Sequence, residues 1–392
     1  MHIIIDMKKI KEFIKKHKLL TIQLGIMLFL IFSLVLLSIL KTNKDICESW
    51  TRGLGQFHSA VFGTINEWIP FSITEVLMIS TIIGTIALLV LSIINFVKRK
   101  VWEAIGKLMA ITLTVLSILT LYNATFEMGY NRKPLDLPLY QKQVKEEKFY
   151  QIVEYFIDDL NSCVDELEFR EDGEVINPYS SKELNKKLKE EYKKLDSDYY
   201  GSYTPTVKEM MTSFIYTAFG ITGWFFGPTG EAAVNYKTTN GEKPMSYAHE
   251  MAHSKGVSTE DGAQMVASYI CLNSEDKYIR YSGYINTLAS IMKMAYFSDV
   301  DNAYNTLYHK INTKVWKNYD YLYKFWDKSA FMLKVGDAIN DWYLKISGQK
   351  DGTSSYQDNP PVIDDQGKVI SLSRYQKLVV QIYAEHFPSE LD

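Results

Sequence analysis

The chain contains few cysteines, and this scarcity excludes two kinds of site. Three are present among 392 residues, namely Cys47, Cys163 and Cys271. They are far apart and odd in number, so they form neither a disulfide framework nor a Cys-x-x-Cys metal site. We expect all three to be free thiols, with Cys271 a small core residue. A bridge between Cys47 and Cys163 stays open as an alternative.

The chain also lacks an excess of charge of either sign. Its 43 basic and 46 acidic residues give a formal net charge of -3. Because the polar part carries no basic stripe, nucleic acid is excluded as an expected partner. The charged residues are unevenly distributed, since the first third of the chain is mostly apolar. Whole-chain averages therefore conceal two different solvent environments.

Three long uncharged runs predict membrane-spanning helices. They cover Leu19 to Leu40, Val76 to Val97 and Leu108 to Phe126. A helix rises about 1.5 Å per residue, so roughly 20 residues cross the apolar core of a bilayer. The first run is longer than the apolar segment of a typical signal peptide and lacks a small-residue cleavage site. We therefore interpret it as an anchor and not as a cleaved signal.

A fourth uncharged run, Met210 to Gly230, is open to the same interpretation. It contains Gly220, Gly223, Gly227 and Pro228. This composition favours a helix followed by a turn in a folded core over a lipid-exposed helix. We therefore expect three spans.

Lysine and arginine placement predicts the orientation of these spans, because basic residues that flank a span resist translocation. One cluster precedes the first span and another follows the second, so both are expected in the cytoplasm. The predicted organisation is a basic cytoplasmic N-terminus at 1–18, a membrane anchor at 19–126 and an extracytoplasmic domain at 127–392. The clusters are Lys8, Lys9, Lys11, Lys15, Lys16 and Lys18, and Lys98, Arg99 and Lys100.

The polar part of the chain is predicted to be mostly helical, since apolar residues recur every three or four positions. Gly230 to Tyr236 is the predicted strand, and Gly348 to Lys368 is a predicted polar loop. The predicted fold class is a mainly α membrane protein, with three N-terminal transmembrane helices before a mostly helical α+β domain with a small sheet. The predicted helices of this domain are Phe149–Leu167, Ser181–Leu195, Tyr278–Met294, Asn302–Phe331 and Val335–Ile346.

The pentapeptide His249-Glu250-Met251-Ala252-His253 is the strongest chemical signal in the chain. Residues four apart on a helix share one face, so the two imidazoles can bind one Zn²⁺. Glu250 would then be the general base and not a ligand. Two structural histidines on a helix face are the plain alternative, so a third ligand is needed to decide.

A catalytic zinc has three protein ligands and an open position for water. The pattern His-Glu-x-x-His-x-x-Gly-x-x-His finds its glycine at Gly256 but has Thr259 where the third histidine should stand. Glu260 to Gln264 instead resembles the Glu-x-x-x-Asp or Glu-x-x-x-Asn stretch of gluzincin peptidases. We predict Glu260 as the third ligand, with Gln264 hydrogen-bonded to a ligand, and Asp261 as the alternative ligand.

Substrate contacts are predicted from the order of the motifs. The developing oxyanion of a tetrahedral intermediate needs a hydrogen-bond donor. Tyr284 is our prediction for this donor, and Tyr281 and Arg280 are the alternatives. The strand before the histidine helix is predicted to pair with an extended substrate through Ala233 and Asn235.

The chain resembles, over nearly its whole length, a bacterial membrane family known only as a domain of unknown function. Members of that family combine three N-terminal spans with a gluzincin-like motif. The resemblance implies a zincin-like, peptidase-like domain and attaches no substrate to it. It also leads us to expect Glu and Asn where this chain has Gly262 and Gln264. The matching stretches are Tyr130–Leu135, Phe219–Asn235, His249–Gln264, Tyr281–Tyr284 and Asn340–Lys345.

These features together predict a membrane-anchored metallopeptidase that binds one Zn²⁺ and hydrolyses peptide bonds of extracytoplasmic or membrane-proximal proteins. Its expected partners are a peptide or protein substrate and the lipid bilayer. The alternative is a pseudo-peptidase domain that binds peptides as a membrane sensor or interaction protein. An intact Glu250 favours the enzyme, because a binding domain needs no general base. A purely structural zinc is disfavoured, because such sites are closed, have four ligands and are rich in Cys.

Overall fold

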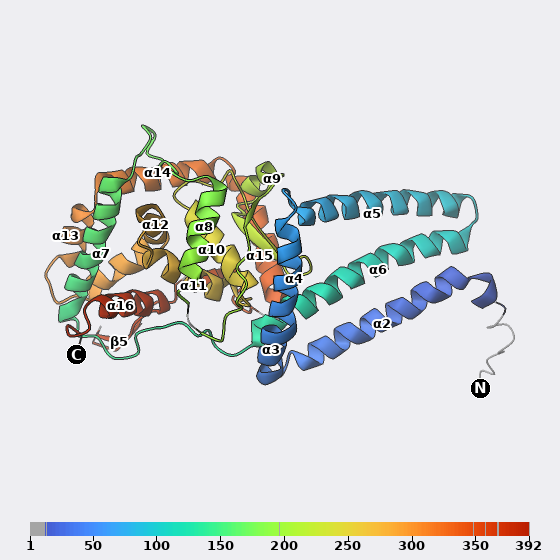
Figure 1. The fold of residues 1–392 in the computed structure, drawn as a ribbon, viewed down its shortest axis with the longest axis horizontal. Coiled ribbons are helices and arrows are strands. Elements are labelled where there is room, and N and C mark those ends of the chain that lie inside the picture. The colour runs from blue at the N-terminus through green and yellow to red at the C-terminus, as the bar shows by residue number, and fades with distance from the viewer. Residues whose placement is uncertain are drawn as a thin grey trace.

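Three long helices extend from one side of a helical domain in the computed structural model (Figure 1). The structure describes residues 12 and 14–391, apart from 196, 348, 357 and 367. The long helices are α2 (Lys18–Leu40), α5 (Ile73–Val97) and α6 (Val101–Thr125), and each is long and apolar enough to cross a membrane. The three predicted spans are therefore confirmed as candidate membrane-spanning helices. Lys8, Lys9 and Lys11 of the first basic cluster lie outside the described residues.

Helix α6 packs against both of the other long helices. The side-chain amide of Gln23 on α2 donates a hydrogen bond to the carbonyl oxygen of Gly106 at 2.9 Å. The hydroxyl of Ser92 on α5 donates to the carbonyl oxygen of Ala104 at 3.1 Å. Polar side chains in a bilayer need such protein partners, because lipid tails offer none.

The fourth uncharged run does not form a span. It contains the six-residue helix α9 (Ser213–Ala218) and strand β2 (Gly223–Phe226). Gly220 follows α9 with φ of +73°, a left-handed conformation that glycine adopts without strain. The expectation of a helix followed by a turn is confirmed.

The domain contains a small three-stranded sheet beside the histidine helix. Strand β3 (Glu231–Val234) lies between β1 (Lys208–Glu209) and β2, parallel to β1 and antiparallel to β2. All four residues of β3 are buried. The predicted strand is confirmed, and it leads through a turn into α10 (Lys243–Ser254).

Helices around α10 form the core of the domain, and most of them match the prediction. Helices α7 (Glu147–Glu166), α8 (Ser181–Tyr192) and α12 (Lys277–Met294) lie where the apolar periodicity places them. The other elements of the domain are η2 (Glu127–Asn131), α11 (Glu260–Leu272), η3 (Ala295–Phe297), α13 (Ala303–Lys310), α14 (Thr313–Asp327), α15 (Ala330–Ser347), η4 (Gly352–Tyr356), β4 (Val362–Ile363), β5 (Val369–Ser371) and α16 (Arg374–His386).

The prediction of one helix over Asn302–Phe331 is wrong, because the chain breaks between α13 and α14. The Asn312 side chain caps α14 by accepting a hydrogen bond from the backbone N–H of Lys314 at 3.0 Å. Asparagine competes for backbone groups in this way and favours helix starts over helix interiors. The predicted polar loop also contains η4 and β4 in its described part.

The three cysteines are free and buried in the structure. Cys47 lies in α3 (Lys44–Trp50), in the loop between α2 and α5, whereas Cys163 lies in α7. The alternative of a Cys47 to Cys163 bridge is therefore not realised. Cys271 is a core residue, as expected.

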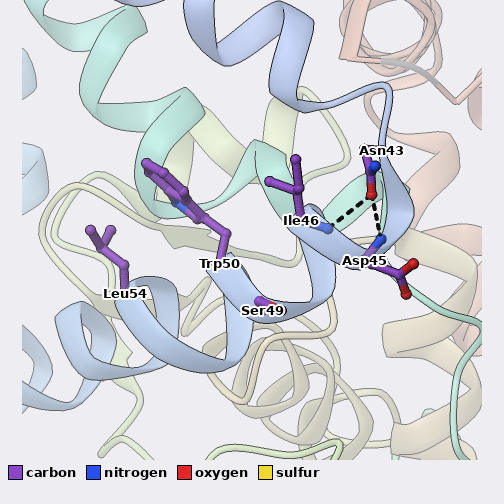
Figure 2. A pocket seen from close by; sticks show the side chains of 6 residues that line it. All are labelled: Asn43, Asp45, Ile46, Ser49, Trp50 and Leu54. Carbon is purple, nitrogen blue, oxygen red and sulfur yellow. Dashed lines mark hydrogen bonds between the residues drawn. The ribbon is translucent and has the colours of Figure 1, made fainter.

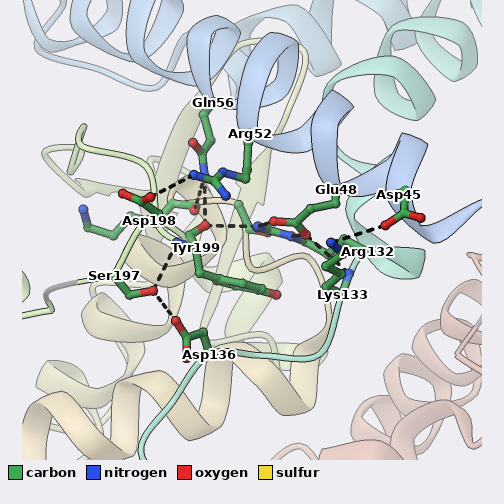
Figure 3. Close-up of polar contacts among 12 residues, drawn as sticks. Asp45, Glu48, Arg52, Gln56, Arg132, Lys133, Asp136, Ser197, Asp198 and Tyr199 are labelled. Atoms are coloured by element: carbon green, nitrogen blue, oxygen red, sulfur yellow. Dashed lines mark hydrogen bonds and ion pairs between the residues drawn. The ribbon is translucent and has the colours of Figure 1, made fainter.

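The loop between α2 and α5 is folded against the domain (Figure 3). It comprises α3, η1 (Thr51–Gly55) and α4 (Gln56–Glu67). Glu48 of α3 accepts two hydrogen bonds from the Arg132 guanidinium, each 2.8 Å long. Arg132 also donates to the carbonyl oxygen of Gly256 at 2.9 Å, and Gln56 donates to that of Lys255 at 3.2 Å. Both carbonyls directly follow α10, so this loop holds the end of the histidine helix.

A second set of contacts fixes the first turn of α5 to the sheet. The Glu231 carboxylate of β3 accepts a hydrogen bond from the backbone N–H of Thr74 at 2.7 Å. The Glu75 carboxylate accepts bonds from the backbone N–H groups of Met211 and Thr212 at 2.6 and 2.9 Å. A carboxylate at a helix N-terminus is stabilised by unpaired N–H groups and by the helix dipole. The domain is thus joined to the long helices at more than one point.

The first prediction concerns the Glu48–Arg132 pair, in which the Arg132 side chain is 2% exposed. Replacing Glu48 with Gln leaves a buried guanidinium without its counter-charge, which typically costs roughly 3 kcal/mol. Thermal unfolding of the full-length protein in detergent should therefore shift to clearly lower temperature. Glu190→Gln is the control, because Glu190 pairs with Lys193 on the exposed surface and should leave the midpoint unchanged.

The same pair predicts an acid-sensitive contribution to stability. The Arg132 guanidinium holds the pKa of Glu48 below its usual 4.5. The contribution is therefore complete above that usual value and is lost as the pH falls through the lowered pKa of the folded state. If the unsubstituted protein and Glu48→Gln had the same thermal unfolding midpoint at neutral pH, the role given to this pair would be contradicted.

Candidate metal centre

Helix α10 places both histidines and Glu250 in the interior of the domain. Pro244 occupies its first turn, where the fixed φ of proline favours helix and its missing N–H leaves no donor unpaired. The helix ends at Ser254, Lys255 is its C-cap, and Gly256 follows with φ of +93°. That left-handed residue lets the chain reverse, so that α11 begins at Glu260 beside the histidines.

The side chains of His249, His253 and Glu260 converge on one point. His249 Nε2 lies 3.0 Å from Glu260 Oε2 and 3.1 Å from His253 Nε2. His253 Nε2 lies 3.5 Å from the same Glu260 oxygen. Ligand atoms placed tetrahedrally about 2.1 Å from a zinc ion are about 3.4 Å apart. The donor set therefore fits one tetrahedral zinc with a fourth position open.

The outer nitrogen of each imidazole is bound to an oxygen acceptor. His249 Nδ1 lies 3.1 Å from Gln264 Oε1, and His253 Nδ1 lies 2.7 Å from the carbonyl oxygen of Val257. An Nδ1–H that donates to such an acceptor leaves the Nε2 lone pair directed at the centre. Gln264 thus occupies the position predicted for it, one turn along α11 from Glu260.

The Glu260 carboxyl is ionised in this environment. Burial raises its pKa, but the imidazoles of His253 and His249 outweigh burial and hold the pKa well below its usual value. An ionised carboxylate is the form that binds a metal.

The alternative ligand Asp261 and the neighbouring Thr259 both make other contacts. The Thr259 side chain caps α11 by accepting a hydrogen bond from the backbone N–H of Gly262 at 3.3 Å. Asp261 forms an ion pair with Arg374 of α16. The first turn of α11 therefore directs one acidic side chain, Glu260, toward the histidines.

Glu250 lies beside the donor set without joining it. Its Oε2 atom is buried and has no hydrogen-bond partner among the described residues. Burial raises the pKa of this carboxyl to about 8, and the nearby Glu260 charge acts in the same direction. Strand β2 passes so close that a Cβ at Gly223 would overlap Glu250 Oε1. Glycine is therefore required where the sheet crosses the carboxylate.

The predicted oxyanion donors lie elsewhere, and this part of the prediction is corrected. The Tyr284 hydroxyl donates to Asp159 at 2.6 Å, and Arg280 donates to the same carboxylate at 2.8 Å. The Tyr281 hydroxyl donates to Asn318 at 2.9 Å. These side chains join α12 to α7 and α14, and their polar groups are committed to that packing.

The predicted substrate residues Ala233 and Asn235 are also corrected. Ala233 is fully buried in the central strand and pairs with Lys208 on one side and Trp224 on the other. The Asn235 side chain donates hydrogen bonds to Thr217 and to the carbonyl oxygen of Ile221. An incoming strand cannot pair with β3, because both of its edges are occupied.

Aromatic residues at the end of the third long helix form a wall of the centre that the sequence reasoning missed. The Phe126 ring meets the His253 ring edge-on, with centroids 5.5 Å apart. Its carbonyl oxygen accepts a hydrogen bond from Ser258 at 2.9 Å. Tyr122 of α6 stacks on Phe226 and is hydrogen-bonded to Tyr343 of α15.

Tyr130 is the residue of this wall with an unused polar group. Its hydroxyl is buried and forms no hydrogen bond of standard length and angle among the described residues, although the neighbouring Tyr343 side chain lies within hydrogen-bonding proximity. Burial raises the pKa of Tyr130, and the neighbouring tyrosines and the Glu260 carboxylate add to the rise. Tyr130 and Tyr343 both lie in stretches that carry the family resemblance, Tyr130–Leu135 and Asn340–Lys345. The resemblance over those two stretches was the sequence signal that could have identified Tyr130 and Tyr343 as residues of the site.

A separate surface hollow has a different character. Figure 2 shows it on α3 and η1, with a volume of about 560 Å³ and a lining of six residues. The lining contains one titratable side chain, Asp45, and none of the candidate metal ligands. Trp50 closes one side and donates a hydrogen bond to the carbonyl oxygen of Ala124 in α6 at 2.7 Å. The hollow therefore lies where the loop between α2 and α5 packs against the end of α6, and we give it no role at the metal centre.

Three candidate spans and a His–His–Glu set with both histidines buried define a membrane-associated protein with a candidate metal centre. The chain belongs to the family described as Protein of unknown function (DUF3810), whose model matches residues 50–361. The matched region contains the donor set, Glu250 and the aromatic wall. The predicted membership of a family of unknown function is thereby confirmed. Comparisons with curated proteins and with solved structures found no match.

The second prediction is that the full-length protein, purified in detergent and reconstituted with zinc, binds close to one ion per chain. His249→Ala and His253→Ala should abolish binding, because two ligands seldom suffice. Glu260→Ala should weaken it strongly, and Gln264→Ala should weaken it by about 10- to 100-fold through loss of an outer hydrogen bond. Elemental analysis and competition with a chelating dye measure both effects.

Asp261→Ala is the matched control, since Asp261 adjoins Glu260 but pairs with Arg374. It should leave the zinc content unchanged. Loss of zinc in Asp261→Ala with retention in Glu260→Ala would move the third ligand and contradict the assignment.

Proposed function

We propose that this protein is a membrane-anchored, zinc-dependent metallopeptidase of the gluzincin type, with a zincin-like domain. The observation that carries the proposal is the arrangement of four side chains. His249, His253 and Glu260 present their donor atoms to one point, while Glu250 lies beside them outside the donor set. A structural metal site would need a fourth protein ligand and no neighbouring base.

The proposed reaction is hydrolysis of a peptide bond. A bound Zn²⁺ would polarise the attacking water and the scissile carbonyl. The positive charge of that metal would lower the raised pKa of Glu250 and so favour its carboxylate form. The carboxylate accepts the proton of the water as oxygen attacks the carbonyl carbon, and later delivers it to the leaving nitrogen. Its buried Oε2 has no competing hydrogen bond among the described residues, so it is available for both transfers.

Tyr130 replaces Tyr284 as the proposed donor to the oxyanion. A buried hydroxyl without a well-formed hydrogen bond is costly, so one that a structure retains calls for an explanation. The Tyr130 hydroxyl is near Glu260, which adds to the rise in its pKa. Its position within the wall is supported by the contact of its ring with Phe126, at 5.8 Å between centroids.

The outer edge of β2 replaces β3 as the proposed binding place for an extended substrate. Strand β2 pairs with β3 on one side, and no strand of the described chain pairs with its other side. Main-chain hydrogen bonds to such an edge hold a peptide in extended form. Because Gly223 of β2 lies against Glu250, a peptide along this edge would pass next to the base.

The third prediction concerns the side of the membrane. We place the domain outside the cytoplasm, because Lys98, Arg99 and Lys100 join α5 to α6 at the end of the bundle far from the domain. A reporter that is active only outside the cytoplasm should be active when fused to the C-terminus. The same reporter fused after Lys100 should be silent. The reverse pattern would place the domain in the cytoplasm.

The fourth prediction separates catalysis from binding. Glu250→Gln keeps the size of the side chain but cannot accept a proton at neutral pH, and loss of a general base costs about 10²- to 10⁴-fold in rate. Full-length protein in detergent, incubated with solubilised envelope proteins, should generate new N-termini that mass spectrometry detects. Glu250→Gln should generate them far more slowly while retaining its zinc.

Two further variants complete this experiment. Tyr130→Phe should retain zinc and lower the rate at saturating substrate, because the oxyanion loses a donor. Glu190→Gln changes an exposed glutamate in the same way and should match the unsubstituted protein. If the zinc-loaded unsubstituted protein cleaves nothing, or if Glu250→Gln cleaves at an equal rate, the peptidase proposal is wrong. The first of these outcomes favours a peptide-binding pseudo-peptidase.

A further inference from the structure

Helix α15 exposes an apolar stripe that no other part of the described chain covers. Its members are Phe331, Ile339, Trp342 and Ile346, spaced so that they lie on one face of the helix. Phe331 is 77% exposed and Trp342 63% exposed. Contiguous apolar patches of this kind mark contacts with protein or membrane.

The stripe is additional to the face by which α15 packs on the domain. On that inner face Leu344 is fully buried. Gly336 lies so close to the carbonyl oxygen of Phe219 that a Cβ would overlap it. The charged side chains Lys334 and Asp337 occupy a third face. The helix therefore has two apolar faces, and packing within the chain accounts for one of them.

Helix α9 and the residues before it expose a second apolar group. Met211, Phe214 and Ile215 are all exposed, with Phe214 at 62%. Trp68, which lies shortly before α5, is 87% exposed. Tryptophan and phenylalanine are enriched at the boundary between lipid and water.

Both exposed groups are attached to the ends of candidate spans. Tyr343 of α15 is hydrogen-bonded to Tyr122 in the last turn of α6. The backbone N–H of Met211 donates to Glu75 in the first turn of α5 at 2.6 Å. Figure 1 shows α9 and α15 on the side of the domain that faces the long helices. The two groups therefore lie level with the points where α5 and α6 leave the bilayer.

We propose that α9 and α15 rest on the bilayer that α2, α5 and α6 cross, in the leaflet on the side of the domain. Phe214, Phe331 and Trp342 insert between lipid headgroups and the upper acyl chains. The partner is lipid and not another protein, because both groups are held by hydrogen bonds at the ends of the spans, where those helices would leave the bilayer. The inference rests on the three helices spanning a membrane and is independent of the metal chemistry.

The test measures the depth of single spin labels in full-length protein reconstituted into lipid nanodiscs. Oxygen is concentrated in lipid and a neutral nickel chelate in water, so their relative effects on a label report its environment. Labels at Phe214→Cys and Trp342→Cys should show an oxygen-to-nickel ratio severalfold above that at Asp337→Cys, on the polar face of α15. The unsubstituted protein is the blank, because its three native thiols are buried.

Ile86→Cys, on the exposed surface of α5, separates failure of this inference from failure of the spans. If the label at position 86 gives a lipid-like ratio while the labels at 214 and 342 give water-like ratios, the proposal is overturned, but the assignment of the long helices as membrane spans stands. A water-like ratio at all positions overturns the membrane assignment itself. A label at position 342 could also be protected from both oxygen and the nickel chelate. If that protection disappears when each nanodisc holds a single chain, a second copy of the protein covers this face, and the proposal is overturned.

Discussion

The Arg132 guanidinium joins the membrane part of the chain to the histidine helix. It binds Glu48 through two parallel hydrogen bonds, donates to the carbonyl oxygen of Gly256 and stacks 3.6 Å from the ring centre of Tyr199. A buried guanidinium is tolerated only when its charge and its donors are satisfied, so removing one of these partners is destabilising. Because Gly256 starts the reversal into α11, the position of Glu260 against the histidines depends on this clamp.

The candidate centre is consequently assembled from parts of the chain that lie far apart in sequence. Helix α10 supplies the histidines, α11 the glutamate, β2 the close contact over Glu250, and the end of α6 the ring against His253. The region after residue 126 is therefore not sufficient for the site as the structure shows it. A truncated domain would lose Glu48, Gln56 and the wall residue Tyr122.

What the sequence predicts well is what depends on neighbours along the chain. Long uncharged runs identify α2, α5 and α6, and four-residue spacing brings His249 to His253 and Glu260 to Gln264. Pairing partners are different, because nothing in Glu231–Val234 itself shows that both of its edges are occupied. The same limit applies to Tyr130 and Tyr284, since which tyrosine keeps a free hydroxyl depends on Asp159, a residue on another helix. A single asparagine, Asn312, divided the helix that periodicity alone made continuous.

The unsatisfied groups bear on the choice between an enzyme and a binding domain. A buried polar atom without a partner costs roughly 1–3 kcal/mol, and more when the group is charged. Glu250 Oε2 and the Tyr130 hydroxyl are two such atoms, and the Glu260 charge raises the pKa of both groups. In a domain that uses zinc only to hold its shape, nothing would offset the free-energy cost of burying these two unpaired groups at one site. Under the proposed hydrolysis, a water molecule to be deprotonated and an oxyanion to be stabilised would be the partners of these two groups.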